Sequence, residues 1–271
     1  MRSRLAIAFA LAPVLAVAIG LSALDRDRGE PATAEPLPQG YYGVAGHVLR
    51  LEAGDGRLAL LGRQLDGLKG TGVSFVRANL DWLQIEPAGP GGRFDFSTHD
   101  DWVAALARRG LRWYAIGVGT PAWAAAPERL AAGCSIFAPP ADPNDYARMM
   151  GAVAARYGSR GTFWRQNPRL PQRPIVDYEI WNEPNLGGFW CPAPEPASYA
   201  ELLVRAARSI RAADPQARII LGGLAPFADD AAVSPSTAAR QSAATFIEEA
   251  MAARPELAEA IDAVGVHLYA P

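Results

Sequence analysis

Short apolar runs alternate with helical stretches from residue 41 to the end of the sequence. The apolar runs are rich in Val, Ile and aromatic residues, are bounded by Gly or Pro, and are mostly too continuous for strands with one face in water. Runs of this kind predict strands at residues 43–47, 74–79, 111–118, 175–181, 218–222 and 263–268. Strands that alternate with helices in this way predict a parallel sheet.

Between these runs, apolar residues recur every three or four positions, as amphipathic helices require. Three helical faces of this kind are Leu58, Leu61, Leu65 and Leu68; Tyr146, Met149, Met150, Val153 and Tyr157; and Tyr199, Leu202, Leu203, Ala206 and Ile210. We expect these faces to be buried against the sheet. None of them has the pattern of a cofactor-binding segment.

Two architectures would accommodate such units: a doubly wound sheet and an eightfold barrel. A dinucleotide-binding sheet requires a glycine-rich turn after its first strand, and the segment from Gly43 to His47 lacks the third glycine of that turn. The barrel is favoured because polar residues stand at the carboxyl ends of the strands, where barrel enzymes keep their chemistry. We therefore predict an α/β fold of the (β/α)8 TIM-barrel type, with residues 41–271 supplying about the first six strand–helix units.

The first forty residues read as a targeting segment and a linker. Arg2 and Arg4 precede an uncharged run at residues 5–24, which predicts a secretory signal. The run is also long enough to span a bilayer, so an uncleaved anchor is the alternative. Residues 25–40 predict a linker, because prolines interrupt regular structure there. We expect a secreted or extracytoplasmic protein, in contact with a membrane only through residues 5–24 if they are retained.

Charge and cysteine content narrow the possible partners. The formal net charge is −2 and no Lys/Arg-rich run occurs, which argues against nucleic-acid binding. Two cysteines in an exported chain suggest one disulfide, Cys134 with Cys191, and two free thiols are the alternative. No group of Cys and His residues has metal-ligand spacing, so we expect no metal and no other cofactor.

Polar and aromatic residues crowd the fourth predicted strand. Strict alternation places Val176, Tyr178 and Ile180 on one face and Asp177, Glu179, Trp181 and Glu183 on the other. Carboxylates cannot face an apolar layer without partners, but they can line the axis of a barrel that opens into a polar cleft. Pro184 ends the strand directly after Glu183, so we expect Glu183 at the rim. Nearby aromatic rings would disfavour its charged form, which suits a general acid.

The segment Trp181-Asn-Glu-Pro-Asn-Leu-Gly-Gly-Phe-Trp190 resembles the signature at the end of the fourth strand in clan A glycoside hydrolases. It is most similar to that of glycoside hydrolase family 39, the β-xylosidase and α-L-iduronidase group, which has bacterial exopolysaccharide hydrolases among its relatives. Residues 76–87, 120–123 and 264–271 also resemble segments of that family, in the same order along the chain.

The resemblance implies retaining cleavage of O-glycosidic bonds in an oligo- or polysaccharide. Glu183 matches the acid/base and Asn182 the residue that binds the sugar 2-hydroxyl, while Arg77 matches the arginine that supports the nucleophile carboxylate. Trp123 lines the cleft in the resemblance, and with Trp190 it is the candidate to stack on sugar. The remaining matches are His267 and Tyr269, which reach toward the nucleophile.

A retaining glycosidase needs a second carboxylate about 5–5.5 Å from the acid/base. The resemblance places it on a seventh strand, and residues 1–271 include six predicted strands. We therefore expect this chain alone to lack the nucleophile and to hydrolyse little. The alternatives are a glycan-binding protein without activity and an α/β protein of unrelated chemistry. Arg77 could instead neutralise Glu179 or Asp177, and His267 could be a core histidine.

Overall fold

The computed structural model describes residues 42–46, 57–226 and 239–268. The predicted signal or anchor, the predicted linker and Tyr269 lie outside these residues. In the described part of the chain, no helix combines the length and the apolar character needed to cross a membrane.

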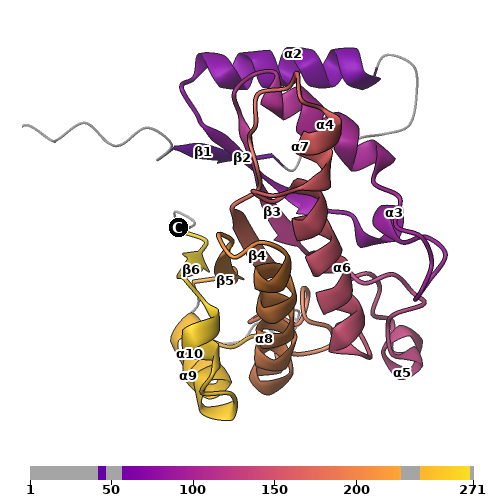
Figure 1. Ribbon diagram of the computed structural model, residues 1–271. Helices are drawn as coiled ribbons and strands as arrows, with labels where there is room; N and C mark the ends of the chain where they lie inside the picture. Colours follow the sequence, from indigo (N-terminus) through magenta and orange to yellow (C-terminus); the bar gives the residue numbers. More distant parts are fainter. Residues whose placement is uncertain (1–41, 47–56, 227–238, 269–271) are drawn as a thin grey trace, which may run out of the picture. The chain divides into compact units, whose positions relative to one another are not determined.

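The described strands form one parallel sheet in which each strand pairs with its neighbour in the sequence (Figure 1). The strands are β1 (Gly43–Ala45), β2 (Phe75–Leu80), β3 (Arg112–Gly117), β4 (Asp177–Asn182), β5 (Arg218–Leu224) and β6 (Ala263–Val266). The helices are α2 (Arg57–Gly70), α3 (Trp82–Ile85), α4 (Ser97–Ala107), α5 (Pro127–Ala131), α6 (Pro143–Tyr157), α7 (Thr162–Gln166), α8 (Pro196–Ala213), α9 (Ala243–Ala253) and α10 (Leu257–Ala260). All six predicted strands are confirmed, with ends that agree to within two residues.

Contacts across the inner surface show that the sheet curls. Arg77 lies on β2 and His267 directly follows β6, yet Arg77 Nη2 lies 3.1 Å from His267 Nε2. In a flat sheet, four strand spacings would hold β2 and β6 about 19 Å apart. The strand order, the strand direction and this curl are those of the first six strands of a (β/α)8 barrel. The predicted fold class is therefore confirmed.

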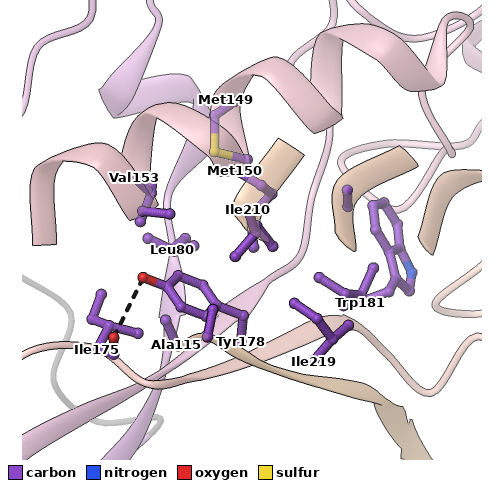
Figure 2. Close-up of a cluster of buried hydrophobic side chains, with 14 of the residues drawn as sticks. Leu80, Ala115, Met149, Met150, Val153, Ile175, Tyr178, Trp181, Ile210 and Ile219 are labelled. Carbon is purple, nitrogen blue, oxygen red and sulfur yellow. Dashed lines mark hydrogen bonds between the residues drawn. The ribbon is translucent and has the colours of Figure 1, made fainter. Parts of the chain in front are cut away.

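The main core lies between the outer surface of the sheet and the helices α6 and α8. Figure 2 shows Met149, Met150 and Val153 of α6 and Ile210 of α8 beside Tyr178 of β4, and all of these side chains are buried. The predicted apolar faces of these two helices are therefore confirmed as core surfaces.

Two buried tyrosines fix the helices to the sheet. The Tyr146 hydroxyl of α6 donates to the carbonyl of Gly117 at 2.6 Å. The Tyr199 hydroxyl of α8 donates to the carbonyl of Ile180 and accepts from the N–H of Gly222, both at 2.8 Å. Tyr199 thereby bridges β4 and β5 near their carboxyl ends, close to Asn182.

Candidate active site

A buried ion pair lies on the inner surface of the sheet, below the candidate acid/base. Arg77 donates through Nε and Nη2 to the two carboxylate oxygens of Glu179, at 2.8 and 2.6 Å. The N–H of Gly223 donates to the same carboxylate at 2.8 Å. Glu179 is 1% exposed, and these donors compensate its charge. Arg77 therefore neutralises Glu179, which was the alternative to its expected role in supporting the nucleophile carboxylate.

Arg77 also connects this pair to the end of β4. Its Nη2 donates to Asn182 Oδ1 at 3.1 Å and lies 3.1 Å from Nε2 of His267. The other ring nitrogen of His267, Nδ1, lies 2.7 Å from Glu183 Oε1. The structure thus brings together four residues that the sequence singled out from three strands: Arg77, Asn182, Glu183 and His267. The resemblance led us to expect that His267 reaches toward the nucleophile. In the described part of the chain, its Nδ1 contacts Glu183 instead.

The backbone at the end of β4 departs from a regular strand. Trp181 and Glu183 have φ values of 69° and 45°, a left-handed conformation that few residues other than glycine adopt. The N–H of Glu183 donates to the carbonyl of Gly223 at 2.9 Å, which ties this turn to β5. Such strained positions gather at functional sites, so the turn itself marks this strand end as a candidate.

The predicted alternation is wrong at Trp181. Its ring packs against Tyr146 of α6 and Trp190, at centroid distances of 6.2 and 5.2 Å, on the helix side of the sheet (Figure 2). The indole N–H donates to the carbonyl of Phe189. Alternation assumes extended backbone throughout, and the positive φ of Trp181 breaks that assumption. Trp181 therefore belongs to the core, while Asn182 reaches Arg77.

The two tryptophans predicted to contact sugar have different surroundings. Trp190 is 0% exposed and packs edge-on against Trp181 and Tyr199. A ring without an exposed face offers no surface for a sugar, so the prediction for Trp190 is corrected to a packing role. Trp123 stays partly exposed, and its indole N–H donates to the carbonyl of Glu86 at 3.2 Å. Trp123 therefore remains a candidate platform.

A disulfide joins the segments that follow β3 and β4. Cys134 and Cys191 are bonded, which confirms the predicted pair. Nearby, the N–H of Cys191 donates to the carbonyl of Phe137 at 3.0 Å. Arg129 adds hydrogen bonds of 2.8 and 2.7 Å to the carboxylate of Glu195. These contacts hold the two segments next to the end of β4, where Glu183 lies.

Burial shifts the pKa values of Tyr114, on the inner surface of the sheet, and of His99, in α4. Burial, and then the negative charge of Glu179, raise the pKa of Tyr114 far above its ordinary value. Burial lowers the pKa of His99 to about 4, and its Nε2 accepts from the N–H of Asp81 at 3.3 Å. His99 is therefore neutral near pH 7 and belongs to the packing of α4, beside Trp113.

Sequence reasoning missed Gly223. A Cβ at this position would lie 2.2 Å from Nε2 of His267, so only glycine leaves room for the ring. The consecutive glycines at the end of β5 were a usable signal, because glycine in a strand often marks close approach of another group. A hollow of about 550 Å³ lies elsewhere, between the start of α4 and the end of α6, and shares no lining residue with this site.

Solved structures share this architecture. A monomeric β-xylosidase from Caulobacter crescentus CB15 aligns with a TM-score of 0.52 and 20% identity, over 86% of this chain and 43% of that one. A GH39 enzyme from Xanthomonas axonopodis pv. citri aligns with a TM-score of 0.56 and 23% identity, over 86% and 42%. A glucosidase from Croceicoccus marinus aligns with a TM-score of 0.51 and 16% identity, over 76% and 40%.

No protein-family model and no curated protein sequence matches this chain. The chain spans less than half the length of the solved chains above. At these identities the likeness establishes the fold: the described residues form the first part of a (β/α)8 barrel. Within that class, the chain is structurally similar to GH39 β-xylosidases and to other glycosidases, as the resemblance at residues 181–190 led us to expect.

Proposed function

We propose that this chain carries the acid/base part of a retaining glycoside hydrolase. One observation carries the proposal: Glu183 stands at the carboxyl end of β4, hydrogen-bonded to His267 and next to Asn182, on the fold of known glycosidases. The carboxyl end of barrel strands is where this fold performs catalysis. The amide of Asn182, held by Arg77, suits a contact with a sugar hydroxyl.

The proposed reaction has two steps. Glu183 donates a proton to the glycosidic oxygen while a second carboxylate attacks the anomeric carbon, so the C–O bond breaks and a glycosyl-enzyme forms. Glu183 then takes a proton from water, the water oxygen attacks the same carbon, and the second carboxylate leaves. The substrate is an O-glycoside of an oligo- or polysaccharide, with Trp123 as the candidate stacking ring.

The other carboxylates of β4 do not suit the role of the nucleophile. Glu179 is engaged by Arg77, and Asp177 by Arg112 at 3.0 Å and Arg218 at 2.7 Å. Both lie deeper on the strand that carries Glu183, so neither can approach a sugar from the opposite side. We propose that the nucleophile belongs to polypeptide that corresponds to the unmatched part of the xylosidases, of which this chain covers 43% in one case.

We also propose that the protein works outside the cytoplasm. The basic and apolar start of the sequence suggests export, and the disulfide between Cys134 and Cys191 supports it, because disulfides persist in oxidising compartments. Cell fractionation of a strain producing the full sequence tests this: the chain should be found outside the cytoplasm with both cysteines oxidised. A reduced chain in the cytoplasm would contradict export.

Azide can test the catalytic proposal on this chain, because it can occupy the place of a missing nucleophile. With 4-nitrophenyl β-xyloside or β-glucoside and azide, we expect an α-glycosyl azide and 4-nitrophenol. The new C–N bond forms as the C–O bond breaks, and the proton of Glu183 passes to the leaving oxygen.

Two variants complete this experiment. Glu183→Gln should slow the azide reaction, whereas Glu128→Gln, at an exposed carboxylate at the start of α5, should leave it unchanged. Oligosaccharide binding without any azide product would favour a glycan-binding protein and contradict the proposal. An azide reaction that does not depend on Glu183 would remove this residue from the mechanism.

A further inference from the structure

His267 makes different contacts through its two ring nitrogens. Nδ1 lies 2.7 Å from Oε1 of Glu183, and Nε2 lies 3.1 Å from Nη2 of Arg77. A neutral imidazole carries one proton, and the hydrogen bonds of the ring decide which nitrogen holds it. The two contacts therefore indicate which nitrogen of His267 carries the ring proton.

The contact with Arg77 decides which ring nitrogen of His267 carries the proton. A guanidinium has only donors, so the nitrogen that faces Arg77 has to accept a hydrogen bond. Nε2 then carries no proton, and the single ring proton is on Nδ1, where it is donated to Glu183 Oε1. Nη2 has two hydrogens: one is donated to Glu179 Oε1, and the other is shared between Asn182 Oδ1 and His267 Nε2. The paired bonds from Nε and Nη2 to Glu179 fix the orientation of the guanidinium independently of His267.

The absence of a side chain at Gly223 lets the ring of His267 lie against the backbone of β5. A Cβ at Gly223 would lie 2.2, 2.7 and 2.8 Å from Nε2, Cδ2 and Cε1 of His267, so the ring rests directly on the backbone of β5. The N–H of His267 donates to the carbonyl of Leu224 at 2.9 Å and holds its backbone against the same strand. The ring thus has a defined place between β2, β4 and β5.

We propose that Arg77 and His267 act together as positioning residues that select which oxygen of Glu183 carries the transferable proton. Oε1 accepts the Nδ1–H of His267, so a proton on Glu183 has to be on Oε2. The role proposed for Glu183 then requires Oε2 to be the oxygen that donates to the glycosidic oxygen. When that proton leaves, the bond from His267 is to a charged carboxylate, and such bonds are stronger than neutral ones. This role rests on the proposed function of Glu183.

The tautomer can be measured without turnover. In the chain labelled with 15N-histidine, long-range proton–nitrogen correlation spectra at neutral pH distinguish the two neutral forms and the doubly protonated ring. The signal lost in His267→Asn assigns residue 267. We expect the Nδ1–H form. A ring with the proton on Nε2, or with protons on both nitrogens, would overturn the proposal. His99 provides an internal reference, because its Nε2 also accepts a hydrogen bond, from Asp81.

Gly223→Ala tests the ring position with the histidine itself unchanged. The added methyl group should displace the ring and abolish the tautomer signature of His267, while the signal of the distant His99 stays constant and reports that the fold is intact. A His267 signal that is unchanged in this variant would contradict the placement of the ring on β5.

Two substitutions separate positioning from packing. An asparagine at 267 can place an amide N–H near the position of Nδ1, whereas a glutamine places it near Nε2. In the azide reaction, His267→Gln should lose about ten- to hundredfold in rate, the range expected for a lost hydrogen bond to a charged group, and His267→Asn should keep most of the rate. Equal losses in both variants would overturn the positioning role. If the unaltered chain shows the Nδ1–H tautomer but no azide reaction, the proposed function is contradicted and the arrangement of Arg77, His267 and Glu183 is supported.

Discussion

Arg77→Met tests the buried ion pair on which the site is built. The substitution removes both guanidinium contacts of Glu179, at 2.8 and 2.6 Å, and leaves the N–H of Gly223 as a donor to a carboxylate that is 1% exposed. Removing one partner of a buried pair costs about 3–5 kcal/mol, because a buried charge loses its compensation. We expect the free energy of unfolding to fall by about 3–4 kcal/mol at pH 7, the lower part of this range, because protonation of Glu179 limits the cost of its buried charge.

Protonation of Glu179 in the variant limits the loss in free energy of unfolding and makes this loss depend on pH. A glutamate in an unfolded chain has a pKa of about 4.3, so keeping it neutral costs about 4 kcal/mol at pH 7 and about 1 kcal/mol at pH 5. In Arg77→Met, folded chains with a neutral Glu179 bind one proton more than unfolded chains between these pH values. The stability of the variant should therefore rise as the pH falls from 7 to 5.

Urea unfolding at pH 7 and pH 5 measures both effects. Arg109→Met is the matched control, because Arg109 makes a similar double contact with Asp66, whose side chain is 64% exposed. Exposed ion pairs contribute little, so this control should lose far less stability. The double variant Arg77→Met with Glu179→Met should recover much of the loss. If Arg77→Met behaves like the control, or loses equally at both pH values, the reasoning about Glu179 is wrong.

Three further outcomes follow from single contacts. As the pH falls from 6.5 to 4, unfolded chains protonate His99 and folded chains do not, so urea titrations should show a loss of about 3 kcal/mol that His99→Phe abolishes; the same slope in both proteins would contradict the burial of His99. Replacing Cys134 and Cys191 together with serine opens a loop of 57-residue separation and should cost about 4 kcal/mol in non-reducing urea, and an unchanged midpoint would refute the pairing. Tyr199→Phe leaves two buried backbone groups of β4 and β5 without this partner and should lower the free energy of unfolding by about 1–3 kcal/mol, measured in the same way; a neutral effect would refute the bridge between β4 and β5.

The fold was accessible from the sequence because its elements are regular. Strands buried on both faces produce continuous apolar runs, and helices that pack on them produce stripes such as the one from Tyr146 to Tyr157 on α6. The apolar pattern alone did not separate a curled sheet from an open one. The barrel was favoured by the polar residues at the strand ends, and the contact between Arg77 and His267 confirms the curl.

The site was predictable in its residues and less so in its geometry. Arg77, Asn182, Glu183 and His267 were identified from strand ends and from the resemblance, and they do converge. The core position of Trp181 depends on a positive φ that alternation cannot anticipate.

The burial of Trp190 could not be read from the sequence either. It depends on Trp181 and Tyr199, and Tyr199 comes from a helix that follows in the sequence. Whether a tryptophan in a loop faces solvent or core is decided by the elements that pack over it, and no local pattern encodes that.

The most direct test asks whether Glu183 delivers a proton to the leaving oxygen. The azide reaction is measured for the unaltered chain and Glu183→Gln with phenyl and with 2,4-dinitrophenyl glycosides of the same sugar. Phenol leaves only with a proton, so its glycoside should react about 10²–10⁴ times more slowly in the variant. Dinitrophenolate leaves without one, so its glycoside should lose less than about tenfold. Equal losses for both glycosides, or no loss for either, would contradict the assignment of Glu183 as the proton donor.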